Sequence, residues 1–463
     1  MSDTINSIPE SLKTGNSYKA DQIRKAIGIG KMPKQIAEQY LKEIKNYEDQ
    51  GIELMSRMSL GEQFSEGQRR LLFKQLIKFW KNELEAKEIT LIVFNISPHS
   101  IEELTLFFAA KLIRRPCIIF QTTSVKELVY VTSDLSMKKL NSDWKYSHIT
   151  PSKLRVKEDI LFNHLSKMRR NFIDVKPWFY ETSYPTKSSI KIRFTNKRKG
   201  RKTQNVNIFP FVHKLTPLGV ERRYSFWLTL LLKYYSLKNA FKNRKLQKFY
   251  RRHCKFNFDL KSKFIYVPLH FQPERTSLPE GCEYYDQLKL VKLISKLAGT
   301  SITIAVKEHK TQFNSALPFD QHRSKQFYQK LSKLKNVVLL SEEQNSVELI
   351  DNSLCVATIT GTAGWEALCR GVPVLAFGTA WYRDCFGAFY GFEETYYKDA
   401  LKKIIRGITI DKQYVDQFLL KLSRFGLNAY TTASYSQGSE LSTSENIDAL
   451  STKILQIIKD MKN

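Results

Sequence analysis

Hydrophobic residues along this chain form two kinds of pattern, short continuous blocks and longer stretches with helical spacing. A polar extension with helical patches at residues 1–60 comes first. The region 61–150 then predicts a helix, a strand, a second helix and a second strand, at Glu66–Glu85, Ile89–Phe94, Ile101–Leu112 and Pro116–Phe120. The last three form a βαβ unit, which places its two strands parallel in one sheet. The pattern therefore predicts an α/β domain over residues 61–150.

The same alternation returns over residues 259–395. Five short apolar blocks predict buried strands, at Phe264–Leu269, Ser301–Val306, Val337–Leu340, Leu354–Thr358 and Val372–Phe377. Helical stretches fill the intervals between them, and this alternation is typical of a doubly wound parallel sheet. The fold class predicted is α/β, with two Rossmann-like doubly wound domains. The remaining residues, 396–463, read as C-terminal helices interrupted by a polar loop.

The region 151–258 differs from both domains in its charge. Between Ser152 and Lys255 there are 27 Lys or Arg residues and 5 Asp or Glu residues, so most of the formal net charge of +29 lies there. The stretch Lys191–Lys202 is densely basic, and Tyr234–Lys255 predicts a basic helix with interleaved aromatics. We interpret the region as a basic, largely helical insert, or as the remainder of the N-terminal domain.

This basic region suggests contact with an anionic lipid surface or an anionic polymer. A solvated helical face is the second interpretation. Nucleic-acid binding is the third and the least favoured, because no zinc knuckle, RNP-like or helix-turn-helix signature accompanies the charge.

The composition excludes several classes of protein. Hydrophobic residues make up 42% of the chain, which excludes a disordered chain. The six cysteines form no CxxC pair, so neither a structural zinc site nor a disulfide framework is expected. The longest apolar run, Phe226–Leu232, is far below the ~20 residues that span a bilayer, and no signal peptide is visible at the N-terminus. We expect a cytoplasmic protein, or one peripheral on the inner face of the cytoplasmic membrane.

Polar side chains gather in the loops that follow predicted strands, where ligands bind in open α/β sheets. Thr360-Gly361-Thr362-Ala363-Gly364 lies between a strand and a helix, so its backbone N–H groups and the helix N-terminus can form an anion site. Glu366 falls in the first helical turn, within reach of a ribose hydroxyl. The alternative is a tight turn in which Thr360 or Thr362 caps the helix.

Three other strand ends carry candidate residues. Lys307, Glu308 and His309 end one strand, and a histidine and a lysine there can contact a phosphate. A solvated loop with a lone histidine is the alternative. Gln272, Glu274 and Arg275 follow another strand, and His99 follows the first domain's strand as a candidate general base or as a structural histidine.

The motifs of the second domain resemble those of the capsule polysaccharide biosynthesis family, whose characterised members include bacterial Kdo transferases. The resemblance is carried by VPLHFQPERTSLPEG, YYDQ, VKEH and TGTAGWEALCRGVPVLAFG, with Trp381-Tyr382 after them, across roughly residues 260–395. NISPHS in the first domain matches more loosely. The family commonly has proline where this chain has Lys310, which leaves the donor identity open.

This resemblance implies a GT-B-type glycosyltransferase whose second domain holds a nucleotide-sugar donor. Lys307 and His309 would contact the donor phosphate, Thr360–Ala363 would cradle it, Glu366 would hold the ribose and Gln272 would line the cleft. Together with the strand-end residues, the candidate donor-binding residues are Arg275, Lys307, Glu308, His309, Thr360, Gly361, Thr362, Ala363 and Glu366. The candidate catalytic residues are His99, Gln272 and Glu274. No metal and no cofactor besides the donor are expected.

The function expected is transfer from a nucleotide sugar, with CMP-Kdo favoured, onto a lipid-linked or anionic glycan acceptor in capsule or other surface polysaccharide or glycolipid synthesis. Two alternatives share the architecture: a polyol-phosphate transferase of the teichoic-acid type, and a non-catalytic polysaccharide assembly or export factor. The sequence leaves the sugar, the acceptor, the stereochemical course and the oligomeric state open.

Overall fold

The computed structural model describes most of the two predicted α/β regions and the ends of the basic insert. The described residues are 38–57, 65–133, 135, 156–170, 226–272, 276–314, 323–436 and 438–461. The basic run Lys191–Lys202 and two of the candidate site residues, Glu274 and Arg275, lie outside these ranges.

The first sheet has the strand order β1-β2-β3-β10. The predicted βαβ unit is confirmed, because β1 (Ile92–Phe94) and β2 (Cys117–Thr122) are parallel and α6 (Ile101–Leu112) connects them. Two strands that the pattern did not predict, β3 (Leu128–Thr132) and β10 (Leu427–Asn428), extend the sheet in antiparallel fashion. Parallel pairing in the first sheet is therefore limited, within the described residues, to β1 and β2.

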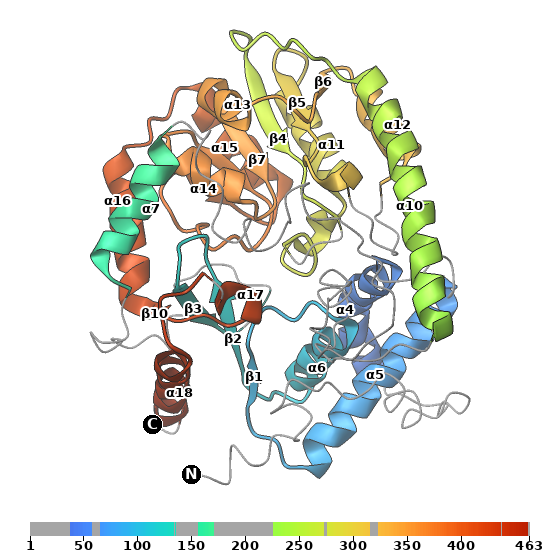
Figure 1. Ribbon diagram of the computed structural model, residues 1–463, viewed down its shortest axis with the longest axis vertical. Helices are drawn as coiled ribbons and strands as arrows, with labels where there is room; N and C mark the ends of the chain where they lie inside the picture. The colour runs from blue at the N-terminus through green and yellow to red at the C-terminus, as the bar shows by residue number, and fades with distance from the viewer. Residues whose placement is uncertain are drawn as a thin grey trace, which may run out of the picture.

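Helices cover both faces of this first sheet. On one side α4 (Glu38–Arg57), α5 (Glu66–Ala86) and α6 share a buried apolar cluster with residues of β1 and β2. Serine capping boxes fix where α5 and α6 begin. On the other side α18 (Thr443–Asp460) packs its buried residues against β2 and β3. The end of the chain thus returns to the first sheet, as Figure 1 shows.

The second sheet is parallel throughout, with the order β6-β5-β4-β7-β8-β9. Its strands are β4 (Phe264–Pro268), β5 (Thr303–Lys307), β6 (Val337–Leu340), β7 (Cys355–Thr358), β8 (Val374–Ala376) and β9 (Ala388–Tyr390). The order reverses between β4 and β7, which makes that boundary the topological switch point where open α/β sheets bind ligands. The expectation of two α/β units is confirmed.

Helices on both faces bury the second sheet. They are α11 (Gln287–Ala298), α12 (Lys325–Ser332), α13 (Ser346–Asn352), α14 (Thr362–Cys369), α15 (Glu394–Ile405) and α16 (Lys412–Phe425). Short segments complete the described chain: η5 (Cys282–Tyr285), η6 (Gln312–Asn314) and α17 (Ala433–Ser436). The segment 396–463, expected as one set of helices, divides between the two units, since α15 and α16 pack on the second sheet and α18 on the first.

The described ends of the basic insert are helices that pack on the second unit. α7 (Glu158–Arg169) contributes Leu161, Leu165 and Met168 to a core shared with α14 and α16. α10 (Phe226–His253) runs along one edge of the molecule past α12, where it buries Leu246 and Tyr250 (Figure 1). In the described part of the chain, no helix combines the length and apolar character that crossing a membrane requires.

Candidate functional site

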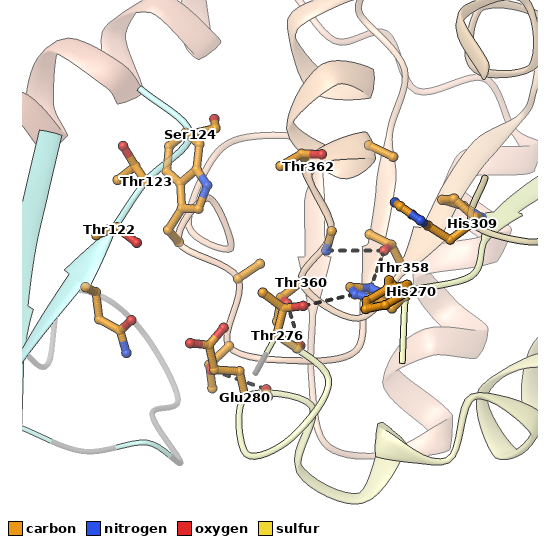
Figure 2. Close-up of a pocket in the computed structure, with 18 of the residues that line it drawn as sticks. Thr122, Thr123, Ser124, His270, Thr276, Glu280, His309, Thr358, Thr360 and Thr362 are labelled. Atoms are coloured by element: carbon orange, nitrogen blue, oxygen red, sulfur yellow. Dashed lines mark hydrogen bonds between the residues drawn. The ribbon is translucent and has the colours of Figure 1, made fainter. Parts of the chain in front are cut away.

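A cavity of about 340 Å³ lies between the two units, at the switch point of the second sheet. One wall comes from the first unit, where the end of β2 and the turn after it supply Gln121, Thr122, Thr123 and Ser124. The opposite wall comes from the loops after β4, β5, β7 and β8, with His270, Thr276, Glu280, His309, Thr358 and residues 360–363 among its members. Figure 2 shows polar side chains from both walls around this space. Its volume and mixed lining suit a small polar ligand.

The turn between β7 and α14 presents a helix N-terminus to the cavity. Gly361 is the N-cap residue of α14 and makes no side-chain cap hydrogen bond. The expected alternative, a cap by Thr360 or Thr362, does not occur, because Thr360 Oγ1 donates instead to the carbonyl oxygen of Thr276 at 2.6 Å. Thr362 and Ala363 line the cavity in the first turn of the helix. An uncapped N-terminus of this kind can bind an anion through its backbone N–H groups.

The two glycines of this turn serve packing within the protein. A Cβ atom at Gly364 would lie 2.7 Å from Cζ of Tyr382, whose hydroxyl donates to the carbonyl oxygen of Gly361 at 2.6 Å. A Cβ atom at Gly361 would lie 2.8 Å from Oγ1 of Thr358 and 3.3 Å from Nε2 of His270. Close approach of the backbone to neighbouring side chains therefore explains both residues.

His270 is a cavity residue that sequence reasoning did not single out. It follows β4, and its ring lies between two threonine hydroxyls, with Nδ1 3.3 Å from Thr276 Oγ1 and Nε2 3.1 Å from Thr358 Oγ1. Burial lowers the pKa of His270 to about 3, and the positive charge of Arg323 adds to the effect. The neutral ring therefore holds together the loops that follow β4 and β7.

His309 lines the cavity, and its neutral ring is a hydrogen-bond donor. Its Nδ1 accepts from the backbone N–H of Thr311 at 3.3 Å, so the ring proton of the neutral form lies on Nε2. Burial lowers the pKa of His309 to about 4. A neutral Nε2–H can donate to a phosphate oxygen, although it brings no positive charge to the site.

Glu308 is buried behind the cavity wall and is fully engaged within the protein. Its carboxylate accepts from Arg323 Nε at 2.7 Å, from the Tyr328 hydroxyl at 2.6 Å and from the backbone N–H of His309 at 2.7 Å. Glu308 does not line the cavity. The structure therefore gives it a positioning role beneath His309.

Lys307 also points away from the cavity. Its Nζ donates to the carbonyl oxygen of Gln344 at 2.6 Å and to Ser346 Oγ at 2.5 Å. Burial lowers the pKa of Lys307 to about 8. In this structure the lysine connects the end of β5 to the start of α13.

Three other predicted site residues lie outside the cavity lining. Glu366 is buried in α14, where burial raises its pKa to about 7 while a hydrogen bond from Thr362 lowers it. Gln272 is buried and donates from Nε2 to Ser277 Oγ at 2.8 Å. His99 is 46% exposed, with Nδ1 3.0 Å from the carbonyl oxygen of Ser97. The predicted set thus meets the cavity through His309, Thr360, Gly361, Thr362 and Ala363.

A chain of hydrogen bonds joins the two walls of the cavity. Ser97 Oγ, in the loop after β1, donates to Glu280 Oε1 at 2.7 Å and accepts from Gln121 Nε2 at 2.5 Å. All three side chains are buried. The only sequence signal for this contact was that Ser97 and Glu280 fall inside the NISPHS and SLPEG motifs.

The described residues hold no group of three or more His, Cys, Asp or Glu side chains placed to bind a metal ion. The polar groups around the cavity include hydroxyls, one side-chain amide, backbone N–H groups, two neutral imidazoles and one carboxylate. Such a set suits a ligand with a phosphate and several hydroxyl groups.

Comparisons with solved structures give distant matches. The beta Kdo 2,7 transferase KpsC of Thermosulfurimonas dismutans is 16% identical, with a TM-score of 0.23 over 40% of this chain and 61% of that chain. The UDP-GlcNAc 2-epimerase of Methanocaldococcus jannaschii is 14% identical, with a TM-score of 0.25 over 85% of this chain and 84% of that chain. The chain spans 61% and 63% of the two KpsC structures that it matches. Likeness this distant says nothing about the reaction.

A comparison with curated proteins gives no match. The family comparison does give one: residues 230–387 match the model described as capsule polysaccharide biosynthesis protein. This segment contains most of α10, the second sheet through β8, and the cavity loops that follow β4, β5, β7 and β8. The resemblance first indicated by the motifs is thereby confirmed, as a match of residues 230–387 to the model of the capsule polysaccharide biosynthesis family.

Proposed function

We propose that the chain is a metal-independent glycosyltransferase that uses a nucleotide-sugar donor to build a capsule or another surface polysaccharide or glycolipid. One observation carries the proposal: the uncapped N-terminus of α14 and the hydrogen-bond donor His309 line the same cavity wall. This wall lies at the switch point of a parallel sheet. Two facing α/β units with a cavity between them are also what a GT-B-type transferase requires.

The chemistry of such a transfer fits this wall. When the sugar leaves, negative charge grows on the phosphate of the nucleotide. Backbone N–H groups at the start of α14 and the Nε2–H of His309 can stabilise that charge, since both are fixed in place before the reaction. Hydrogen bonds from these partly buried N–H groups are stronger than they would be in water, because little water competes for them.

The opposite wall fits an acceptor with many hydroxyl groups. The end of β2 and the turn after it present an amide and three hydroxyl side chains, those of Gln121, Thr122, Thr123 and Ser124. Such groups exchange hydrogen bonds readily with glycan hydroxyls. We propose a lipid-linked or anionic glycan as the acceptor, bound between this wall and the donor.

The surface of α10 supports an anionic membrane as the place of action. The helix contains eight Lys or Arg residues and no Asp or Glu. Tyr234, Leu237 and Phe241 are 59%, 64% and 63% exposed, and their spacing puts them on one helical face. Large exposed apolar side chains among basic ones are typical of helices that lie on anionic lipid. A membrane-peripheral enzyme would meet a lipid-linked acceptor at this surface.

The test is the thermal stability of the full chain with CMP, CDP, UDP, GDP, CMP-Kdo, UDP-GlcNAc and CDP-glycerol. A ligand present at 100 times its Kd stabilises the folded state by about 2.7 kcal/mol. We expect one nucleotide and its sugar to raise the melting temperature, with CMP and CMP-Kdo favoured. His309→Ala and Ala363→Asp should remove the shift, whereas His253→Ala, at an exposed position on α10, should retain it.

The alternatives give different results in the same test. Stabilisation by CDP-glycerol without any sugar nucleotide favours the teichoic-acid-type polyol-phosphate transferase. Stabilisation by a capsule glycan without any nucleotide favours the assembly or export factor and contradicts the enzyme proposed here.

A further inference from the structure

Glu280 is the one carboxylate among the described side chains that line the cavity. It comes from the turn before η5, and it is 7% exposed. Figure 2 shows its side chain directed into the space between the β2 turn and Thr360. A carboxylate in this place faces both the proposed donor wall and the proposed acceptor wall.

Neither histidine of the lining is placed to take a proton from an acceptor. Both ring nitrogens of His270 are engaged by threonine hydroxyls. His309 uses Nδ1 to accept from the N–H of Thr311, so Nε2 carries the proton and can only donate. Burial also lowers the pKa of both rings, so they hold added protons poorly. The exposed His99 is not part of the lining.

Contacts from both units fix the position of Glu280. The N–H of Thr379, after β8, donates to the backbone oxygen of Glu280 at 2.8 Å. Ser97 Oγ, from the first unit, donates to the side-chain Oε1 at 2.7 Å. The carboxylate is therefore held on the boundary where a donor bound by the second unit would meet an acceptor bound by the first.

We infer that Glu280 is the general base of the proposed transfer, an inference that rests on the proposed function. Glu280 removes the proton from an acceptor hydroxyl group as the hydroxyl oxygen attacks the anomeric carbon of the donor. A bond forms between that carbon and the acceptor oxygen, and the bond from the carbon to the phosphate oxygen breaks. Its electron pair stays on the phosphate, which leaves as part of the nucleotide. Ser97 and Gln121 are positioning residues that hold the base in place.

The decisive variant is Glu280→Gln in the full chain. Glutamine keeps an oxygen that can accept from Ser97, so the link between the units stays, but it cannot take up the proton. Nucleotide release from CMP-Kdo and UDP-GlcNAc is measured with a membrane glycolipid extract as acceptor, beside the thermal shift caused by CMP and UDP. We expect release to fall by about 10²- to 10⁴-fold with an unchanged thermal shift, and Glu280→Asp to recover part of the rate.

Two further variants separate a catalytic role from a structural one. Ser97→Ala breaks the link between the units but leaves the carboxylate, so it should reduce release much less than Glu280→Gln does. Glu283→Gln, three positions further on and exposed, should leave release unchanged. Release by Glu280→Gln within threefold of the wild type, or equal losses in Glu280→Gln and Ser97→Ala, would overturn the inference.

Failure of the proposed function looks different. A wild-type chain whose melting temperature responds to none of these nucleotides contradicts the transferase itself. If the wild-type chain binds a nucleotide but releases none from either sugar nucleotide, the nucleotide site is supported and the assignment of Glu280 as the base is contradicted.

Discussion

Arg323 and Glu308 form a buried ion pair, with 2.7 Å between Nε and Oε2 and side chains that are 4% and 0% exposed. Arg323 also donates from Nη2 to the carbonyl oxygen of His270 at 3.0 Å, and Glu308 accepts from the N–H of His309. One buried pair thus positions both histidines of the cavity wall. A charged side chain needs such partners when it is buried, because its removal from water costs free energy.

Glu308→Gln should destabilise the fold strongly. The substitution leaves the buried guanidinium of Arg323 without its counter-ion, which typically costs about 3–5 kcal/mol. Urea unfolding at neutral pH measures the loss. The matched control is Glu283→Gln, which removes the partner of Lys289 from an ion pair whose two side chains are about half exposed. Exposed pairs contribute about 0–1 kcal/mol, so comparable losses in the two variants would contradict the role assigned to Glu308.

Gly364→Ala should destabilise the chain through the packing of Tyr382. The added methyl group would lie 2.7 Å from Cζ of Tyr382, so the ring or the start of α14 must shift. Overpacking of this kind typically costs about 1–3 kcal/mol, measurable as a lower melting temperature. Gly67→Ala is the control, because the nearest atom to a Cβ there is the Ser65 hydroxyl at 4.0 Å. Alanine in that helix should be neutral or stabilising, by up to about 1 kcal/mol.

His164 should make the fold sensitive to acid. Its Nε2 accepts from the indole N–H of Trp365 at 2.8 Å, and burial lowers its pKa from 6.5 to about 4. Between these two values the unfolded chain binds more protons than the folded chain, so stability falls as the pH is lowered from about 6.5 toward about 4. In His164→Gln, whose amide oxygen can still accept from Trp365, this loss should be smaller.

Urea unfolding at pH 7 and at pH 5 tests this expectation. The exposed His253, replaced by Gln, is the matched control. Part of the stability lost between pH 7 and pH 5 should still be lost in His164→Gln, because burial also lowers the pKa of His270 and His309. An identical loss in the wild type and in His164→Gln would show that this histidine is not held neutral by the fold.

The sequence was most informative about the second sheet. Strands buried on both faces appear as continuous apolar runs, so β4 to β8 were located within about two residues. It was least informative about β10, because a two-residue strand has no pattern and pairs with β3 some 300 positions earlier in the chain. β9 was also missed, since its three residues are only partly buried.

For the site, the sequence located the loops better than the side chains. Loops that follow strands must meet at one edge of a parallel sheet, so the β5 and β7 loops could be predicted to lie together. Lys307, Glu308 and Glu366 were expected to contact a ligand, yet a charged residue at a strand end can equally be satisfied inside the protein. Glu280 was overlooked because its partner Ser97 is 183 positions away.

The exposed face of α10 should bind anionic membranes. Phe241→Ser removes an apolar side chain that is 63% exposed, and burying a phenylalanine is worth about 1.5–3 kcal/mol. We therefore expect at least about tenfold weaker binding to vesicles that contain one third phosphatidylserine, measured by co-sedimentation. Lys245→Glu should weaken binding to a similar degree, because each basic residue near the surface contributes about 1 kcal/mol. This effect should shrink at high salt.

Phe162→Ser is the matched control for this surface. Phe162 is 52% exposed and lies on α7, whose first turn is acidic, so its loss should leave vesicle binding unchanged. Equal weakening in Phe162→Ser and Phe241→Ser would mean that any exposed aromatic side chain contributes and that α10 has no special part. Binding that survives both α10 substitutions would place the lipid contact on another surface. Binding lost in Lys245→Glu and kept in Phe241→Ser would indicate purely electrostatic attraction without insertion of the apolar side chains.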